Sequence, residues 1–258
     1  YQVGVLDAVR EILDEAGWPA LRNPYTVVCG TSAGALNAAA LAAGCDDPGQ
    51  AVRAMVQTWS TLHASDVYRT DARGALGNAA HWLGGLTMGW VVRSRPRSLF
   101  DNAPLAALLQ RSFEPRRIAG HLERGILRAL AITASSYTSG QHVTYFQSAQ
   151  PVATWTRMQR LACPATLSVE HLLASSAIPF VFPAVSLALD GRREFFGDGS
   201  MRQLAPISPA IHLGADRVLV IGPGAIGLLF VAALRQSGLH DVTLAGRNRR
   251  RLEIGERL

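Results

Sequence analysis

The sequence predicts an α/β fold with a largely parallel central sheet. Short segments rich in β-branched residues alternate with longer helix-forming segments, which is typical of strands joined by helical crossovers. Two of these strands pass directly into glycine-containing turns, one near each end of the chain. The chain has 258 residues, 48% of them hydrophobic, so it can bury a full core.

The first of these turns carries a chemical motif. Residues 25–29 predict a short buried strand, and residues 35–43 are a run of helix formers. Between them stands Gly30-Thr31-Ser32-Ala33-Gly34, the G-x-S-x-G pattern of a nucleophile elbow. The glycines remove side chains that would clash at a sharp turn, and the helix start directs its N–H groups at a developing oxyanion. We therefore predict that Ser32 is a nucleophile, with Gly30, Ala33 and Gly34 supporting it.

A nucleophilic serine needs a base, and the sequence offers two kinds. Of the seven histidines, His212 preserves the order serine, aspartate, histidine along the chain, but it lies at a predicted helix end. Asp198 stands between Gly197 and Gly199 at the end of an apolar strand, where flanking glycines let its carboxylate approach a hydroxyl closely. We therefore predict Asp198 as the base and a surface or capping role for His212.

These motifs resemble those of the patatin-like phospholipase family, which pairs G-x-S-x-G with a D-G-[GA] aspartate motif. Residues 1–6 resemble the start of the family's first helix, residues 131–146 its central hairpin, and residues 173–183 its A-S-x-A-x-P-x-x-F-P segment. The resemblance covers residues 1–221 and implies a patatin-like acyl hydrolase domain, folded as a three-layer sandwich with a largely parallel central sheet. It also implies a Ser32–Asp198 dyad that cleaves lipid or other carboxylic esters without a metal or organic cofactor.

The chain departs from the family pattern at two positions. Ser200 stands where the family has glycine or alanine after the aspartate motif. The family's glycine-rich oxyanion loop precedes its first helix, whereas this chain begins at Tyr1, where that loop should already have ended. Losing one oxyanion donor costs roughly 10²- to 10³-fold in turnover. We therefore expect an impaired hydrolase or, as an alternative, a catalytically silent chimeric chain.

The second glycine-containing turn lies in residues 218–227, where G-x-G-x-x-G directly follows an apolar strand. A helix is expected over residues 228–236 and another strand over residues 241–244. This Rossmann-like βαβ segment, residues 217–258, resembles the N-terminal NADP-binding unit of the ketopantoate reductase family. The alternative function is therefore that of an NADP-binding reductase fragment, with the cofactor held by Gly222, Gly224, Gly227 and Arg247. In a simpler interpretation, residues 215–222 add a strand to the hydrolase sheet.

The composition indicates which binding partners and which cellular location to expect. The three cysteines, Cys29, Cys45 and Cys163, lack metal-type spacing, which predicts a reduced cytoplasmic setting and no metal site. Apolar residues 82–92, flanked by arginines, predict either a flap that contacts a membrane peripherally or a core insertion. The expected partner is a lipid or ester substrate. The arginines of residues 247–251 are assigned to a solvated helix start, so no nucleic-acid partner is expected.

Overall fold

The computed structural model describes residues 1–69, 98–201 and 207–222, together with the backbone of residues 242–245. The N-terminal elements are α1 (Gln2–Glu15), β1 (Val27–Thr31), α2 (Ala33–Ala43), α3 (Pro48–Thr61), α4 (Ala64–Val67), α6 (Ala103–Ser112) and α7 (Pro115–Glu123). The central elements are β2 (Ala129–Ser136), β3 (His142–Ser148), β4 (Thr156–Arg157), β5 (Arg160–Pro164), α8 (Val169–Ser176), β6 (Val185–Leu189) and β7 (Arg192–Asp198). A short 3₁₀ helix (Gly199–Met201), α9 (Ile207–His212), β8 (Val218–Ile221) and β9 (Val242–Ala245) follow.

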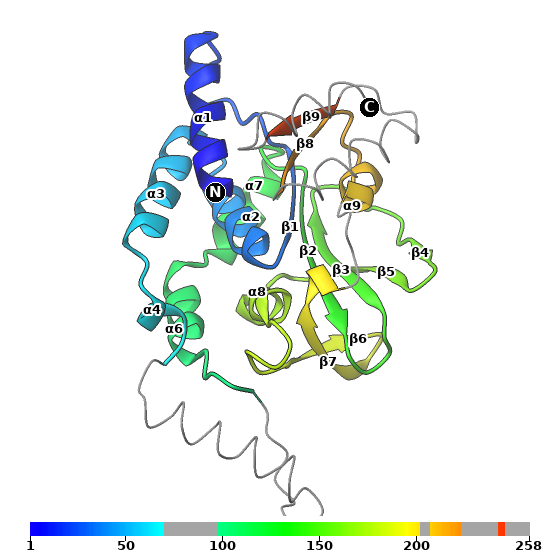
Figure 1. Ribbon diagram of the computed structural model, residues 1–258. Coiled ribbons are helices and arrows are strands. Elements are labelled where there is room, and N and C mark those ends of the chain that lie inside the picture. Colours follow the sequence, from blue (N-terminus) through cyan, green and yellow to red (C-terminus); the bar gives the residue numbers. More distant parts are fainter. Residues whose placement is uncertain (70–97, 202–206, 223–241, 246–258) are drawn as a thin grey trace, which may run out of the picture.

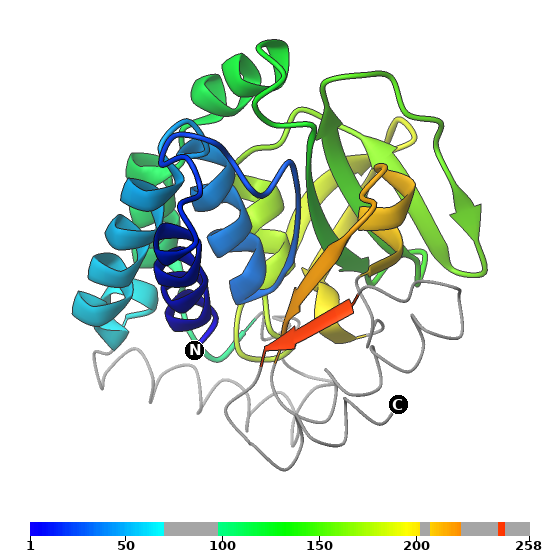
Figure 2. The ribbon, with the colours of Figure 1, turned by 90° about the horizontal axis from the view of Figure 1, so that it is seen from above.

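The α/β class and the three layers are confirmed. Strands β4, β5, β3, β2, β7 and β6 lie side by side in that order, and β1 also pairs with β2 (Figure 1). Helices α1, α2 and α3 lie on one side of this sheet and α9 lies on the other, as Figure 2 shows in blue, cyan and orange. The expected hairpin at residues 131–146 is also present as strands β2 and β3.

The prediction of a largely parallel sheet was wrong, because the sheet is mixed. Only the β1–β2 and β3–β5 pairs are parallel, whereas β2–β3, β2–β7, β4–β5 and β6–β7 are antiparallel. Short connections account for the antiparallel pairs of consecutive strands. For example, Asp190 and Gly191 both have positive φ, 48° and 76°, and form a two-residue turn between β6 and β7. Such a turn forces its two strands to be antiparallel, since a parallel pair requires a long crossover.

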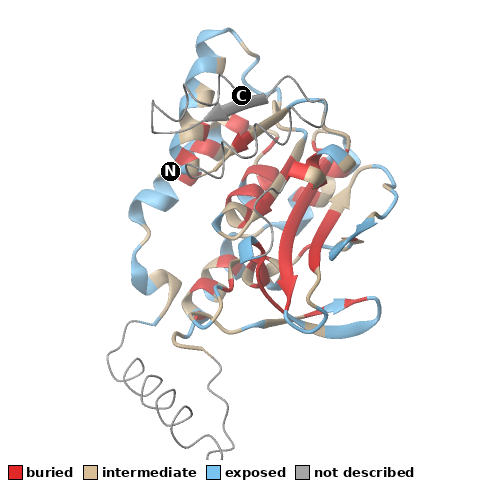
Figure 3. Ribbon diagram, turned by 45° about the vertical axis from the view of Figure 1, so that its right-hand side comes forward, coloured by how far each residue is buried: buried red, intermediate tan, exposed pale blue. Residues whose placement is uncertain are grey.

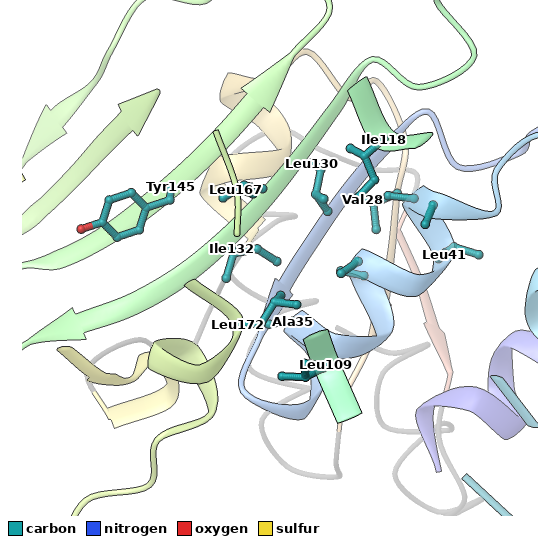
Figure 4. Packing of buried hydrophobic residues seen from close by; sticks show 14 of the residues in the cluster. Val28, Ala35, Leu41, Leu109, Ile118, Leu130, Ile132, Tyr145, Leu167 and Leu172 are labelled. Atoms are coloured by element: carbon teal, nitrogen blue, oxygen red, sulfur yellow. The ribbon is translucent and has the colours of Figure 1, made fainter. Parts of the chain in front are cut away.

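The central strand β2 separates two cores. All eight of its residues are buried, as Figure 3 shows in red. Leu130 and Ile132 face the larger core with Ala35 and Leu41 of α2 and with Leu172 of α8 (Figure 4). The alternate residues, Ala129 and Ala131, face a smaller core with Phe146 and with Leu213, which follows α9. This two-residue alternation lets one strand pack against helices on both faces of the sheet.

One edge of β2 holds two strands end to end. Strand β1 pairs with it in parallel from Val27 opposite Ala129 to Thr31 opposite Thr133. Strand β7 runs the other way and reaches the next position, with Asp198 opposite Ala134. Because the two strands approach each other along a shared edge, their carboxyl ends meet in the middle of β2.

The C-terminal strands stand apart from this sheet, so the interpretation that residues 215–222 add a strand to it was wrong. Strand β8 pairs in parallel with β9 in a separate two-stranded sheet. A cavity of 150 Å³, lined by Val27 and Cys29 of β1 and by Leu219 and Ile221 of β8, lies between the two strands. The predicted helix over 228–236 and the segment 82–92 lie outside the described residues.

None of the helices in the described part of the chain combines the length and the apolar character needed to cross a bilayer.

Candidate active site

Ser32 occupies the turn between β1 and α2, as the sequence predicted. Its backbone has φ 58° and ψ −132°, a conformation that costs a non-glycine residue about 1–3 kcal/mol. Gly30 permits the turn, because a Cβ there would overlap the Gly34 carbonyl oxygen and lie 2.7 Å from the Cβ of Ala38. The absence of a side chain at residue 30 therefore lets α2 pack directly behind the end of β1.

The second glycine of the motif is less constrained than predicted. A Cβ on Gly34 would meet only the flexible side chain of Gln2, at 3.4 Å. Ala33 is the exposed first residue of α2, and the Ser32 side chain makes no capping hydrogen bond to this helix. The first-turn N–H groups of a helix have no acceptor within the helix. The turn thus presents uncapped backbone donors beside Ser32.

Ser32 and Asp198 meet directly. The Ser32 hydroxyl donates to Oδ2 of Asp198 at 2.6 Å, and the aspartate is only 3% exposed. The other carboxylate oxygen, Oδ1, accepts from the backbone N–H and the hydroxyl of Ser200, at 2.8 and 2.7 Å. The Asp198 N–H donates to the carbonyl of Ala177 at 2.8 Å. These bonds hold the carboxylate in one orientation, with one oxygen facing the serine proton.

Gly197 and Gly199 are both required by close neighbours. A Cβ on Gly199 would overlap the Thr133 carbonyl oxygen and lie 2.8 Å from Cγ2 of Thr31. A Cβ on Gly197 would overlap the hydroxyl of Tyr137. Burial raises the pKa of Tyr137, and the nearby charge of Asp198 raises it further. The glycines thus let β7 lie against β2 and β1, as the predicted close approach of the aspartate requires.

Ser175 is a site residue that the sequence did not reveal. It lies on α8, fully buried, and its hydroxyl accepts a hydrogen bond from the Ser32 N–H at 3.0 Å. The same hydroxyl donates to the carbonyl of Thr133 at 2.6 Å. Ser175 therefore links the strained turn to both α8 and β2. Its only sequence signal was its place in the apolar segment 173–183, which the family resemblance covers without assigning a role to this serine.

His212 lies elsewhere, in agreement with the predicted helix end. It is the last residue of α9, and its ring stacks on Trp155 at 4.5 Å and 12°. Trp155 in turn stacks on Phe146 and belongs to the smaller core, across the sheet from α2. Burial lowers the pKa of His212, and Arg157 lowers it further. The structure does not bring this histidine to Ser32.

Of the predicted cofactor-binding residues, only Gly222 is described. It directly follows β8, and no described residue other than its chain neighbours lies within 4 Å of the point where its Cβ would stand. Gly224, Gly227 and Arg247 lie outside the described residues. Within the described ranges, no three potential metal ligands lie together, and Cys29, Cys45 and Cys163 are free thiols.

Comparisons with known families divide the chain in two. A family model described as patatin-like phospholipase matches residues 1–211. A second, described as ketopantoate reductase PanE/ApbA, matches residues 218–257. No curated protein sequence matches the chain. The first match spans every residue of the Ser32–Asp198 site, and the second begins at the first residue of β8.

Replacing Ser175 with alanine is expected to destabilise the fold by about 1–3 kcal/mol, because the Ser32 N–H and the Thr133 carbonyl would lose a buried partner. Ser176→Ala is the matched control, since that hydroxyl only bonds back to Leu172 and Leu173 within its own helix. Urea unfolding of both variants measures the difference. Equal loss of stability in the two variants would contradict the bridging role of Ser175.

Proposed function

The chain belongs to the patatin-like phospholipase family, and from this premise we propose that it is a serine acyl hydrolase of the phospholipase A or lipid esterase type. The observation that carries the proposal is the 2.6 Å hydrogen bond from the Ser32 hydroxyl to the buried Asp198 carboxylate. A serine becomes nucleophilic when a positioned base takes its proton, and a carboxylate within hydrogen-bond reach can be that base.

In the proposed reaction, Ser32 Oγ attacks the ester carbonyl carbon while its proton passes to Oδ2 of Asp198. The tetrahedral intermediate then expels the alcohol, which takes that proton, and leaves an acyl group on Ser32. Asp198 next accepts a proton from water, whose oxygen attacks the acyl-enzyme. The carboxylic acid departs and Ser32 regains its proton, so both residues return to their starting states.

The negative oxygen of each intermediate needs hydrogen-bond donors. The N–H of Ala35 already bonds to the Ser32 carbonyl, at 2.8 Å. The N–H groups of Ala33 and Gly34 come before it in the same uncapped turn, and the positive end of the helix dipole adds to their effect. We assign these two N–H groups to the oxyanion.

Exposed apolar side chains near the dyad favour a substrate that is held in a membrane. Ile178 and Phe180 follow the Ala177 carbonyl that binds Asp198, and Met201 lies three residues after the aspartate. All three side chains are exposed, by 45%, 68% and 58%. The exposed Phe180 also has a backbone φ of 66°, which is a strained conformation for a bulky residue. We propose that this rim inserts into a lipid surface, and the free thiols favour a cytoplasmic membrane face.

The dyad predicts the reactivity of Ser32 toward a fluorophosphonate probe. Wild-type protein should be labelled, Ser32→Ala should not, and Asp198→Asn should label about 10²- to 10⁴-fold more slowly, because the base is lost. His212→Ala is the control and should label like the wild type, since its ring lies across the sheet. Labelling that survives in Ser32→Ala, or that disappears in His212→Ala, would overturn the dyad.

The apolar rim predicts binding to phospholipid vesicles. The double variant Ile178→Ser and Phe180→Ser should reduce the vesicle-bound fraction in a flotation assay by about tenfold or more, from the apolar area lost. Ile12→Ser is the control, because Ile12 is 62% exposed near the far end of α1. An equal effect of the control, or no effect of the double variant, rejects this surface as the contact.

A second candidate function is NADP binding by the C-terminal segment. It is supported by the parallel pairing of β8 with β9 and by the match of residues 218–257. Glycines at this turn let a pyrophosphate approach the backbone, and an arginine after the second strand suits a 2′-phosphate. Arg247, two residues after the end of β9, is the candidate for that contact.

Arg247→Ala should therefore weaken NADPH binding about tenfold or more while leaving NADH binding unchanged, because only NADPH carries the 2′-phosphate. Titration of intrinsic fluorescence with each nucleotide measures both affinities. Absence of NADPH binding at millimolar concentration, or equal effects on the two nucleotides, excludes this candidate.

A further inference from the structure

A groove of 450 Å³ runs along one side of α2. Its walls are one face each of α2, α3 and α6, represented by Ala40 and Ala43, by Ala54 and Trp59, and by Leu105 and Leu108. The volume lies within the range of about 300–1,000 Å³ that is usual for small-molecule sites. None of the dyad residues lines the groove, so it is a separate feature of the molecule.

The groove opens one helical turn from the nucleophile. Leu36 lies four residues after Ser32 on α2, and Leu172 lies three residues before Ser175 on α8; both line the groove. The Ser32 N–H donates to the Ser175 hydroxyl, so α2 and α8 lie close together at these two residues. One turn of helix advances about 5.4 Å, so the end of the groove at Leu36 and Leu172 lies about one helical turn from Ser32 and Ser175.

The opposite end of the groove lies at the turn between α2 and α3. There the two helices pack closely, since a Cβ on Gly44 would lie 2.6 Å from that of Ala51. From Leu36 to Gly44 the groove follows α2 for about 12 Å, at 1.5 Å per residue. The groove therefore extends away from Ser32 along α2.

The polar groups of the groove stand at its two ends. Near the mouth, the Asn37 amide already donates to Gln2 and accepts from the Trp59 indole, both at 2.7 Å. At the far end, Arg117 is paired with Asp46 at 2.9 Å. Most of the remaining wall is alanine, leucine, Met55 and Phe113. The hydroxyls of Thr58 and Ser112 also line it, but each donates to a carbonyl of its own helix, at 2.9 Å. A peptide would lose water from its backbone groups there without replacement hydrogen bonds, whereas a hydrocarbon chain loses none.

We propose that this groove holds the fatty acyl chain of the ester that Ser32 cleaves, which rests on the proposed hydrolase function. The alanines make the assignment specific. Small alanine side chains on α2 and α3 border the open volume on one side, and leucines of α6 border it on the other. The groove, and not the dyad, then selects the length of the acyl chain.

Filling the groove tests the proposal through chain-length selectivity. Ala40→Leu and Ala54→Leu, both at exposed positions in the wall, should lower the ratio of kcat/KM for the decanoate over the butyrate p-nitrophenyl ester by about tenfold or more. Ala107→Leu is the matched control: it lies exposed on α6, outside the lining residues, and should leave the ratio and both activities unchanged. An unchanged ratio in both wall variants overturns the proposal.

Direct binding separates the groove from the chemistry. In Ser32→Ala protein, decanoate should change the fluorescence of Trp59, and the change should be lost in the added Trp59→Phe variant and weakened about tenfold by Ala54→Leu. This outcome without any Ser32 labelling would retain the groove and reject the hydrolase. Labelling of Ser32 with no Trp59-dependent signal would retain the hydrolase and overturn the groove.

Discussion

The site depends on the shared edge of β2. Strand β1 runs parallel to it and ends opposite Thr133, while β7 runs antiparallel and ends opposite Ala134. Two strands that approach each other along one edge must bring their carboxyl ends together. The turn that follows one strand and the last residue of the other therefore become neighbours, although Ser32 and Asp198 are 166 residues apart in the chain.

The same edge explains how a strained turn is held in place. Ser32 has a positive φ, and its N–H is directed at Ser175, whose hydroxyl is tied to the carbonyl of Thr133 on β2. The packing of α2 behind β1 adds to this restraint, because Gly30 allows contact with Ala38. Conformational strain of this kind persists only where the surroundings determine it from several sides. Here α2, α8 and β2 all contribute, and the Ser32 hydroxyl is left free to point at Asp198.

Local patterns predicted much of this site. The strand, turn and helix around Ser32 followed from residues within one short stretch, and so did the glycines beside Asp198. The direction of the strands was not predicted correctly, because it depends on short turns such as Asp190-Gly191 rather than on the apolar pattern of each strand. The parallel pairing of β8 with β9 agrees with the βαβ segment expected there, but the apolar pattern of β8 by itself did not decide between that segment and the hydrolase sheet.

The sequence by itself determined the chemistry of the two motifs: a serine at a glycine-flanked turn, an aspartate between glycines, and a strand before each. The tertiary structure alone decided that these motifs face each other and that Ser175 and Ser200 orient them. It also decided that alanines of α2 and α3 border a groove instead of a filled core. The physical reason is that local backbone preference acts over a few residues. Register and helix packing, by contrast, bring together segments that are more than a hundred residues apart.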